Sequence, residues 1–111
     1  MTEVLLVCSG DGCFRSCRAT GHAGFAAAGT DIVCAAETAV LRTAMQVLEH
    51  TEGVRFFADT SSRGYLAFRV ERDASASAER LVCTADFIRA GISGLAAEYP
   101  RHVRLREMTE D

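Results

Sequence analysis

The sequence contains no tryptophan, a single proline and no long apolar run. A membrane-spanning helix needs about 20 consecutive apolar residues, so we expect no membrane segment. The net charge is −3 and the basic residues form no block. Phosphate recognition requires a concentrated basic surface, so the sequence argues against direct binding of nucleic acid. The first residues also lack the charged and apolar segments of a secretion signal.

Apolar residues make up 49% of the 111 positions, which is enough to form a core, and we expect one domain over residues 1–111. The chain has five cysteines: Cys8, Cys13, Cys17, Cys34 and Cys83. An odd number of cysteines without a secretion signal indicates a reducing compartment, so we expect a cytoplasmic protein. Cys8 and Cys83 lie in apolar stretches and are predicted to be core residues.

The hydrophobic pattern predicts the element order β-β-α-β-β-α-β. Strands are expected at residues 3–8, 14–20, 54–58, 65–71 and 102–108. The first helix should begin after Asp31, close at Gly53 and bury a face that includes Val47. The second should run over 81–99, with Gly91 and Gly94 allowing close packing. We therefore expect an α+β fold in which two amphipathic helices pack on a mixed, mostly antiparallel sheet of about five strands.

Residues 21–36, "GHAGFAAAGTDIVCAA", place a histidine and a cysteine on either side of a small-residue loop. If Asp31 caps the helix, Cys34 is its third residue, where unpaired N–H groups favour an anion. Lowering a thiol pKa from about 8.5 to about 6.5 requires about 2.7 kcal/mol, whereas a helix N-terminus typically supplies about 0.3–1 kcal/mol. A nearby imidazolium would close this gap, and His22 is the candidate.

Other interpretations of these residues stay open. A cysteine in an apolar helix is more often part of the core, and a histidine after a strand is more often a surface residue. Cys13, Cys17 and His22 have the spacing C-x3-C-x4-H, which matches no common zinc pattern and lacks an evident fourth ligand. We therefore expect no metal and no cofactor. A thiol redox protein would need a resolving cysteine, and the sequence has no C-x-x-C pair.

The same segment resembles the signature of the ribosomal-processing cysteine protease family (Prp). Its members carry Gly-His-Ala-Gly, a second glycine and then Asp-Ile-Val-Cys-Ala-Ala, and weaker similarity extends over the whole chain. The resemblance implies that His22 and Cys34 are the catalytic pair and that the protein is a homodimer. It further implies an endopeptidase that removes a short N-terminal extension from a large-subunit ribosomal protein. Such an enzyme cuts after an aromatic residue and supports ribosome assembly.

The resemblance also implies a mobile loop that covers the site. Gly21, Gly24 and Gly29 are expected to shape this loop, and Phe25 is expected to help line an apolar pocket for the aromatic residue. Asp31 has two open roles, as the helix cap or as a third catalytic residue that orients the histidine.

This chain departs from the usual family pattern directly after the cysteine. The family usually continues Cys-Ala-Ala-Val-Ser, whereas this chain has Glu37 and Thr38 in place of the valine and serine. Thr38 keeps a hydroxyl one helical turn after Cys34 and is expected to support it. The charge of Glu37 is expected either to raise the pKa of the thiol or to alter contacts with the substrate.

Two predictions complete the expected mechanism. Backbone N–H groups at the start of the helix, including that of Cys34, are candidate donors to the oxyanion. The alternative to an enzyme is a non-catalytic ribosome-assembly factor that binds the same ribosomal protein.

Overall fold

A computed structural model describes residues 1–21 and 31–110 of the chain. The elements in this part of the chain are β1 (Thr2–Cys8), β2 (Phe14–Thr20), α1 (Ile32–Glu49), β3 (Val54–Asp59), β4 (Tyr65–Arg72), α2 (Ala78–Glu98) and β5 (Val103–Thr109). The predicted order β-β-α-β-β-α-β is confirmed. No helix within the described residues is both long and apolar enough to span a membrane.

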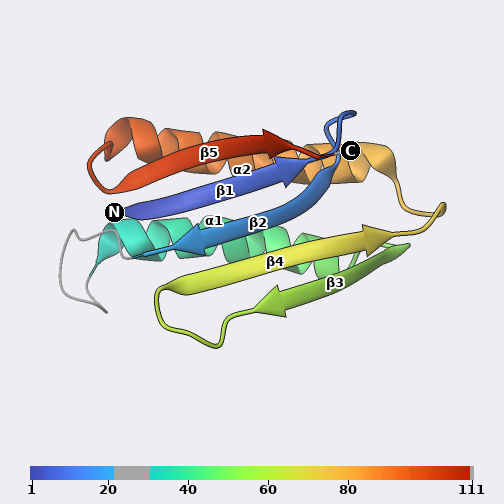
Figure 1. Cartoon of the computed structure of the whole chain (residues 1–111), viewed down its shortest axis with the longest axis horizontal. Coiled ribbons are helices and arrows are strands. Elements are labelled where there is room, and N and C mark those ends of the chain that lie inside the picture. The colour runs from blue at the N-terminus through green and yellow to red at the C-terminus, as the bar shows by residue number, and fades with distance from the viewer. Residues whose placement is uncertain (22–30, 111) are drawn as a thin grey trace.

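The strands form one sheet in the order β3-β4-β2-β1-β5 (Figure 1). Three of its pairings, β1 with β2, β2 with β4 and β3 with β4, are antiparallel. β5 lies parallel to β1, with Leu105 opposite Val4. The predicted mixed, mostly antiparallel sheet is therefore confirmed.

Both helices lie on one face of the sheet, which is the far face in Figure 1. Alternate residues of the strands point toward the helices, so Val4 and Leu6 of β1 are fully buried. The rings of Phe14 on β2 and Phe68 on β4 stack with their centroids 5.5 Å apart. Leu41 of α1 is also fully buried, so this layer between sheet and helices forms the core.

The helices approach each other closely at Gly91 of α2. A β-carbon at this position would lie 2.8 Å from Cγ1 of Val40 on α1, so no larger residue fits without a shift. A β-carbon at Gly94 would meet no atom within 4 Å. The prediction of close packing is confirmed at the first glycine and wrong at the second.

Three other predictions are wrong in detail. Val47 is 37% exposed, because the buried stripe of α1 passes through positions 33, 37, 41, 44 and 48 and leaves position 47 beside it. Cys83 is exposed on α2, whereas Cys8 is buried as predicted. α1 ends at Glu49 instead of continuing to Gly53, which has a φ of +76° in the turn before β3.

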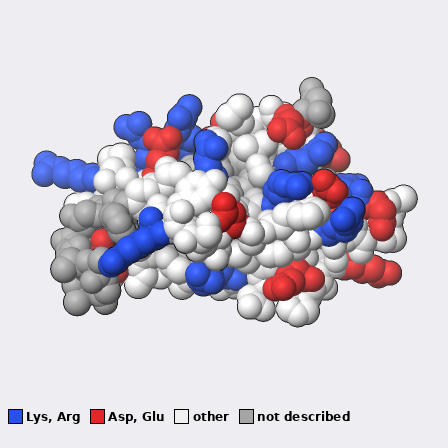
Figure 2. Space-filling model, turned by 60° about the horizontal axis from the view of Figure 1, so that its bottom comes forward, with Lys and Arg blue, Asp and Glu red and all other residues white. Residues whose placement is uncertain are grey.

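The sheet face opposite the helices carries ion pairs between neighbouring strands. Glu3 on β1 lies 3.1 Å from Arg106 on β5, and Glu71 on β4 lies 3.8 Å from Arg55 on β3. Figure 2 shows arginines and acidic residues interspersed on the side of the molecule that it presents. These pairs are exposed, so each contributes little to stability.

Candidate functional site

The start of α1 is organised by Asp31, whose backbone is extended (φ −74°, ψ 103°). Its Oδ1 accepts a hydrogen bond of 2.9 Å from the backbone N–H of Cys34, and its carbonyl accepts one of 3.0 Å from Ala35. This is the geometry of a helix cap. The predicted capping role of Asp31 is confirmed, and Cys34 is the third residue of α1.

The cap changes the prediction about the oxyanion donors. Because the N–H of Cys34 donates to Asp31, it is not available to a substrate oxygen while the cap is in place. The two N–H groups before it belong to Ile32 and Val33, and neither has a hydrogen-bond partner among the described residues. A side chain in a helix leans toward the N-terminus, so the Cys34 sulfur leans toward these donors.

The Cys34 side chain is partly exposed. Partial burial raises the pKa of its thiol, and the negative charges of Glu37 and Asp31 raise it further. The nearby hydroxyl of Thr38 lowers the pKa. The described groups together therefore hold the thiol in its neutral form, and a nearby cation would be needed to ionise it.

Glu37 is the feature of this site that the sequence indicated least clearly. Its side chain is 5% exposed and faces the sheet as part of the buried stripe of α1. Burial raises its pKa to about 7. The expected effect of Glu37 on the thiol is confirmed in direction. A clue was present in the sequence, because position 37 lies one helical turn from the apolar positions 33 and 41.

Two more residues that sequence analysis missed lie on the strands beside Glu37. Thr2 on β1 is 1% exposed, and Cys17 on β2 is 1% exposed. The pKa of Cys17 is raised to about 12, chiefly by burial and secondly by the charge of Glu37. Only the pairing of β1 with β2 under the helix brings these residues together, so sequence spacing gave no signal for them.

Gly21 is held firmly at the end of β2. Its φ is +92°, a backbone conformation that favours glycine, and a β-carbon there would lie 2.6 Å from the backbone oxygen of Met1. Its N–H donates to the carbonyl of Gly64 over 2.9 Å. Gly21 therefore fixes the direction in which the chain leaves the sheet. His22, Gly24, Phe25 and Gly29 lie outside the described residues.

Cys13 is occupied with other contacts. Its thiol lies 3.7 Å from the carbonyl of Ala78 and 3.1 Å from Nη1 of Arg72. Within residues 1–21 and 31–110, no three histidine, cysteine or acidic side chains are grouped so that they could hold a metal ion.

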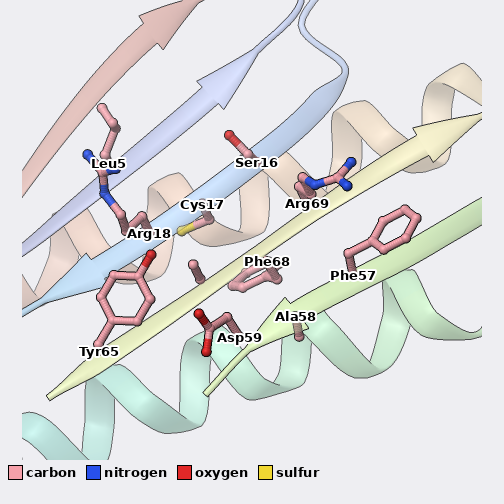
Figure 3. A pocket seen from close by; sticks show the side chains of 11 residues that line it. Leu5, Ser16, Cys17, Arg18, Phe57, Ala58, Asp59, Tyr65, Phe68 and Arg69 are labelled. Atoms are coloured by element: carbon pink, nitrogen blue, oxygen red, sulfur yellow. The ribbon is translucent and has the colours of Figure 1, made fainter. Parts of the chain in front are cut away.

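A cavity of about 320 Å³ lies over β2, β3 and β4 (Figure 3). The guanidinium of Arg69 lies over the ring of Phe57 at 4.1 Å on one side, and Tyr65 faces Arg18 on the other. None of its lining residues is a predicted site residue, so this cavity is separate from Cys34.

Comparison with known proteins relates this architecture to a protease family. The family model described as cysteine protease Prp matches residues 1–104. No curated protein matches the chain.

Several solved structures share the fold. One is the essential ribosomal processing protease Prp from S. aureus with a covalently linked product peptide. It has a TM-score of 0.77 and 21% identity over 97% of this chain and 100% of that chain. The same protease with a substrate peptide has a TM-score of 0.75 and 19% identity over 97% and 100% of the two chains. SMU.848 from Streptococcus mutans has a TM-score of 0.77 and 28% identity over 99% of this chain and 96% of that chain. These likenesses confirm the α+β fold.

Proposed function

Because the chain belongs to the cysteine protease Prp family, we propose that it removes a short N-terminal extension from a large-subunit ribosomal protein. The cut follows an aromatic residue, and the reaction supports ribosome assembly. A single protease domain over residues 1–111 carries the activity and acts as a homodimer in the cytoplasm. Supporting this proposal are the family match over residues 1–104 and the Prp structures of the same fold that hold a substrate or product peptide.

The observation that carries the proposal is the position of Cys34 at the capped start of α1, with a partly exposed thiol. In the reaction, His22 takes the proton of the Cys34 thiol, and the thiolate attacks the scissile carbonyl. The amide nitrogen then leaves with a proton from His22, and the acyl group remains on the sulfur as a thioester. Water hydrolyses the thioester with His22 as general base, which restores the thiol.

His22 is assigned to this role because the described surroundings of Cys34 raise the pKa of the thiol. A thiol in such surroundings needs an imidazolium partner to become an effective nucleophile at neutral pH. Asp31, the cap of α1, is negatively charged, which suits a second role in orienting the His22 imidazole. Asp31 is buried at the start of α1, and its Oδ1 accepts the hydrogen bond from the Cys34 N–H.

We assign the oxyanion to the N–H groups of Ile32 and Val33. Both belong to the first turn of α1, toward which the Cys34 side chain leans, and the Cys34 N–H is held by the cap. Removing one donor of this kind costs an enzyme about 10²–10³ in kcat. The nearby hydroxyl of Thr38 favours the thiolate and supports the reaction.

The test is cleavage of a large-subunit ribosomal protein that carries its N-terminal extension, with the products identified by mass. Cys34→Ala, Cys34→Ser and His22→Ala should each abolish cleavage while circular dichroism remains that of the folded protein. Cys83→Ser is the matched control, because Cys83 is exposed on α2 and should be dispensable. Full activity in Cys34→Ala would remove this thiol from the mechanism. Binding of the ribosomal protein without any cleavage would favour a non-catalytic assembly factor.

A further inference from the structure

Glu37 is a buried acid on the face of α1 that packs against the sheet. Among the described residues, no arginine or histidine pairs with its carboxyl, and its Oε2 has no hydrogen-bond partner. The hydroxyl of Thr2 on β1 is also buried without a partner. It lies near enough to favour the charged form of Glu37, although the two groups lack the geometry of a hydrogen bond. Burying a carboxylate without a partner is costly, so a structural role alone does not explain this residue.

The surroundings of Glu37 contain thiols and one other acid. Cys34 and Glu37 are three residues apart, which places both side chains on the same side of α1. Cys17 on β2 and Asp31 at the cap of the helix are near enough for their charges to interact with that of Glu37. Every charge that these described neighbours can carry is negative. An ionised Glu37 therefore opposes formation of a thiolate at Cys34, whereas a protonated Glu37 does not.

We propose that Glu37 is a positioning residue that restrains the nucleophile Cys34 when its carboxyl is ionised and releases it when the carboxyl is protonated. The inference rests on the proposed function, in which Cys34 is the nucleophile.

The expected consequence is an unusual dependence of thiol reactivity on pH. The pKa of Glu37 is about 7, so the carboxyl loses its proton in the range where Cys34 would otherwise become increasingly ionised. The two groups titrate as a pair, and the rise of thiolate with pH is spread over a wider range than for one isolated thiol.

The experiment measures the rate of alkylation of Cys34 by iodoacetamide as a function of pH between about 6 and 9, a range that brackets an ordinary thiol pKa. Peptide mapping by mass spectrometry separates Cys34 from the other cysteines. Glu37→Gln, which keeps the shape of the side chain, should alkylate about tenfold faster near pH 8, equivalent to a thiol pKa about one unit lower. Its pH profile should also lack the titration that Glu37 adds to the wild-type profile. Glu37→Val should behave in the same way.

Two controls separate this effect from a general change in structure. Glu49→Gln removes an exposed charge at the other end of α1 and should leave the profile of Cys34 unchanged. The exposed Cys83 reports the reagent and the pH in every variant, and its rate should be constant. Thr2→Val tests the inference without changing Glu37 itself. Loss of the hydroxyl disfavours the charged form of Glu37, so the alkylation rate of Cys34 should rise near neutral pH.

A Cys34 profile that is identical in the wild type, Glu37→Gln and Glu37→Val would overturn the inference. The same result would leave the proposed function standing if the wild type cleaves the ribosomal protein. Conversely, a shifted profile in a protein that cleaves nothing would support the role of Glu37 and refute the proposed function, because alkylation requires no proteolysis.

Discussion

Replacing Gly91 by alanine tests how the two helices pack. A β-carbon at position 91 would lie 2.8 Å from Cγ1 and 3.2 Å from Cγ2 of Val40, while a β-carbon at position 94 of the same helix would meet nothing within 4 Å. Both positions gain the same helix propensity from alanine, but only position 91 faces α1. Comparison of Gly91→Ala with Gly94→Ala therefore separates helix propensity from packing.

The magnitudes follow from two opposed effects. Alanine in place of an interior glycine stabilises a helix by about 1 kcal/mol. At position 91 this gain is opposed by overpacking, which costs about 1–3 kcal/mol. Val40 is β-branched and has one preferred rotamer in a helix, so it cannot easily turn its methyl groups away. We expect Gly94→Ala to raise the free energy of unfolding by about 1 kcal/mol and Gly91→Ala to lower it by about 1 kcal/mol.

Urea unfolding followed by far-ultraviolet circular dichroism measures both changes, provided that the slopes agree among the variants. Val40→Ala creates space opposite position 91, so Gly91→Ala should become stabilising in the Val40→Ala background. The account of the helix contact would be refuted if Gly91→Ala in the wild type stabilised the protein as much as Gly94→Ala does.

Three further predictions concern the site and its surroundings. Gly21→Ala should lower the free energy of unfolding by about 1–3 kcal/mol in urea titrations, because the residue has a positive φ and its β-carbon would meet the backbone of Met1; unchanged stability would contradict this. The pKa of Glu37 is 4.5 in the unfolded chain and about 7 in the folded protein. The free energy of unfolding therefore falls as pH rises between these two values, because the unfolded chain releases the proton first. Glu37→Gln should remove this loss and be more stable above pH 7 by up to about 3 kcal/mol, whereas equal stability at all pH values would argue against burial of the acid. Under native conditions iodoacetamide should label Cys83 and spare Cys17, whose pKa is about 12, and rapid labelling of Cys17 would be inconsistent with its burial.

The parts of the fold that could be predicted from sequence depend on neighbouring residues. The short apolar run that includes Val4 and Leu6 indicated a strand, and the spacing of Val33 and Leu41 indicated an amphipathic helix. Asp31 was recognisable as the cap because its side chain needs only the N–H three residues later, at Cys34. These features arise from interactions within a few positions of the chain.

The sheet order and the environment of Cys34 depend on contacts between distant segments. Nothing in the sequence of β5 showed that it lies parallel to β1 at the edge of the sheet. The burial of Glu37 depends on its packing over β1 and β2, whereas a charged side chain on a helix is ordinarily expected to be solvated. Cys83 lies in an apolar stretch and is nevertheless exposed, because α2 turns that side away from the core.

The role of Cys34 as the nucleophile of a protease that cuts after aromatic residues is tested most directly by an affinity label. A peptidyl chloromethyl ketone that ends in phenylalanine should form one covalent adduct, located at Cys34 by mass spectrometry, and none in Cys34→Ala. The adduct at Cys34 should form much faster than with a peptidyl chloromethyl ketone that ends in glycine. An adduct formed mainly at the exposed Cys83, or a rate at Cys34 no greater than with the glycine reagent, would contradict the account.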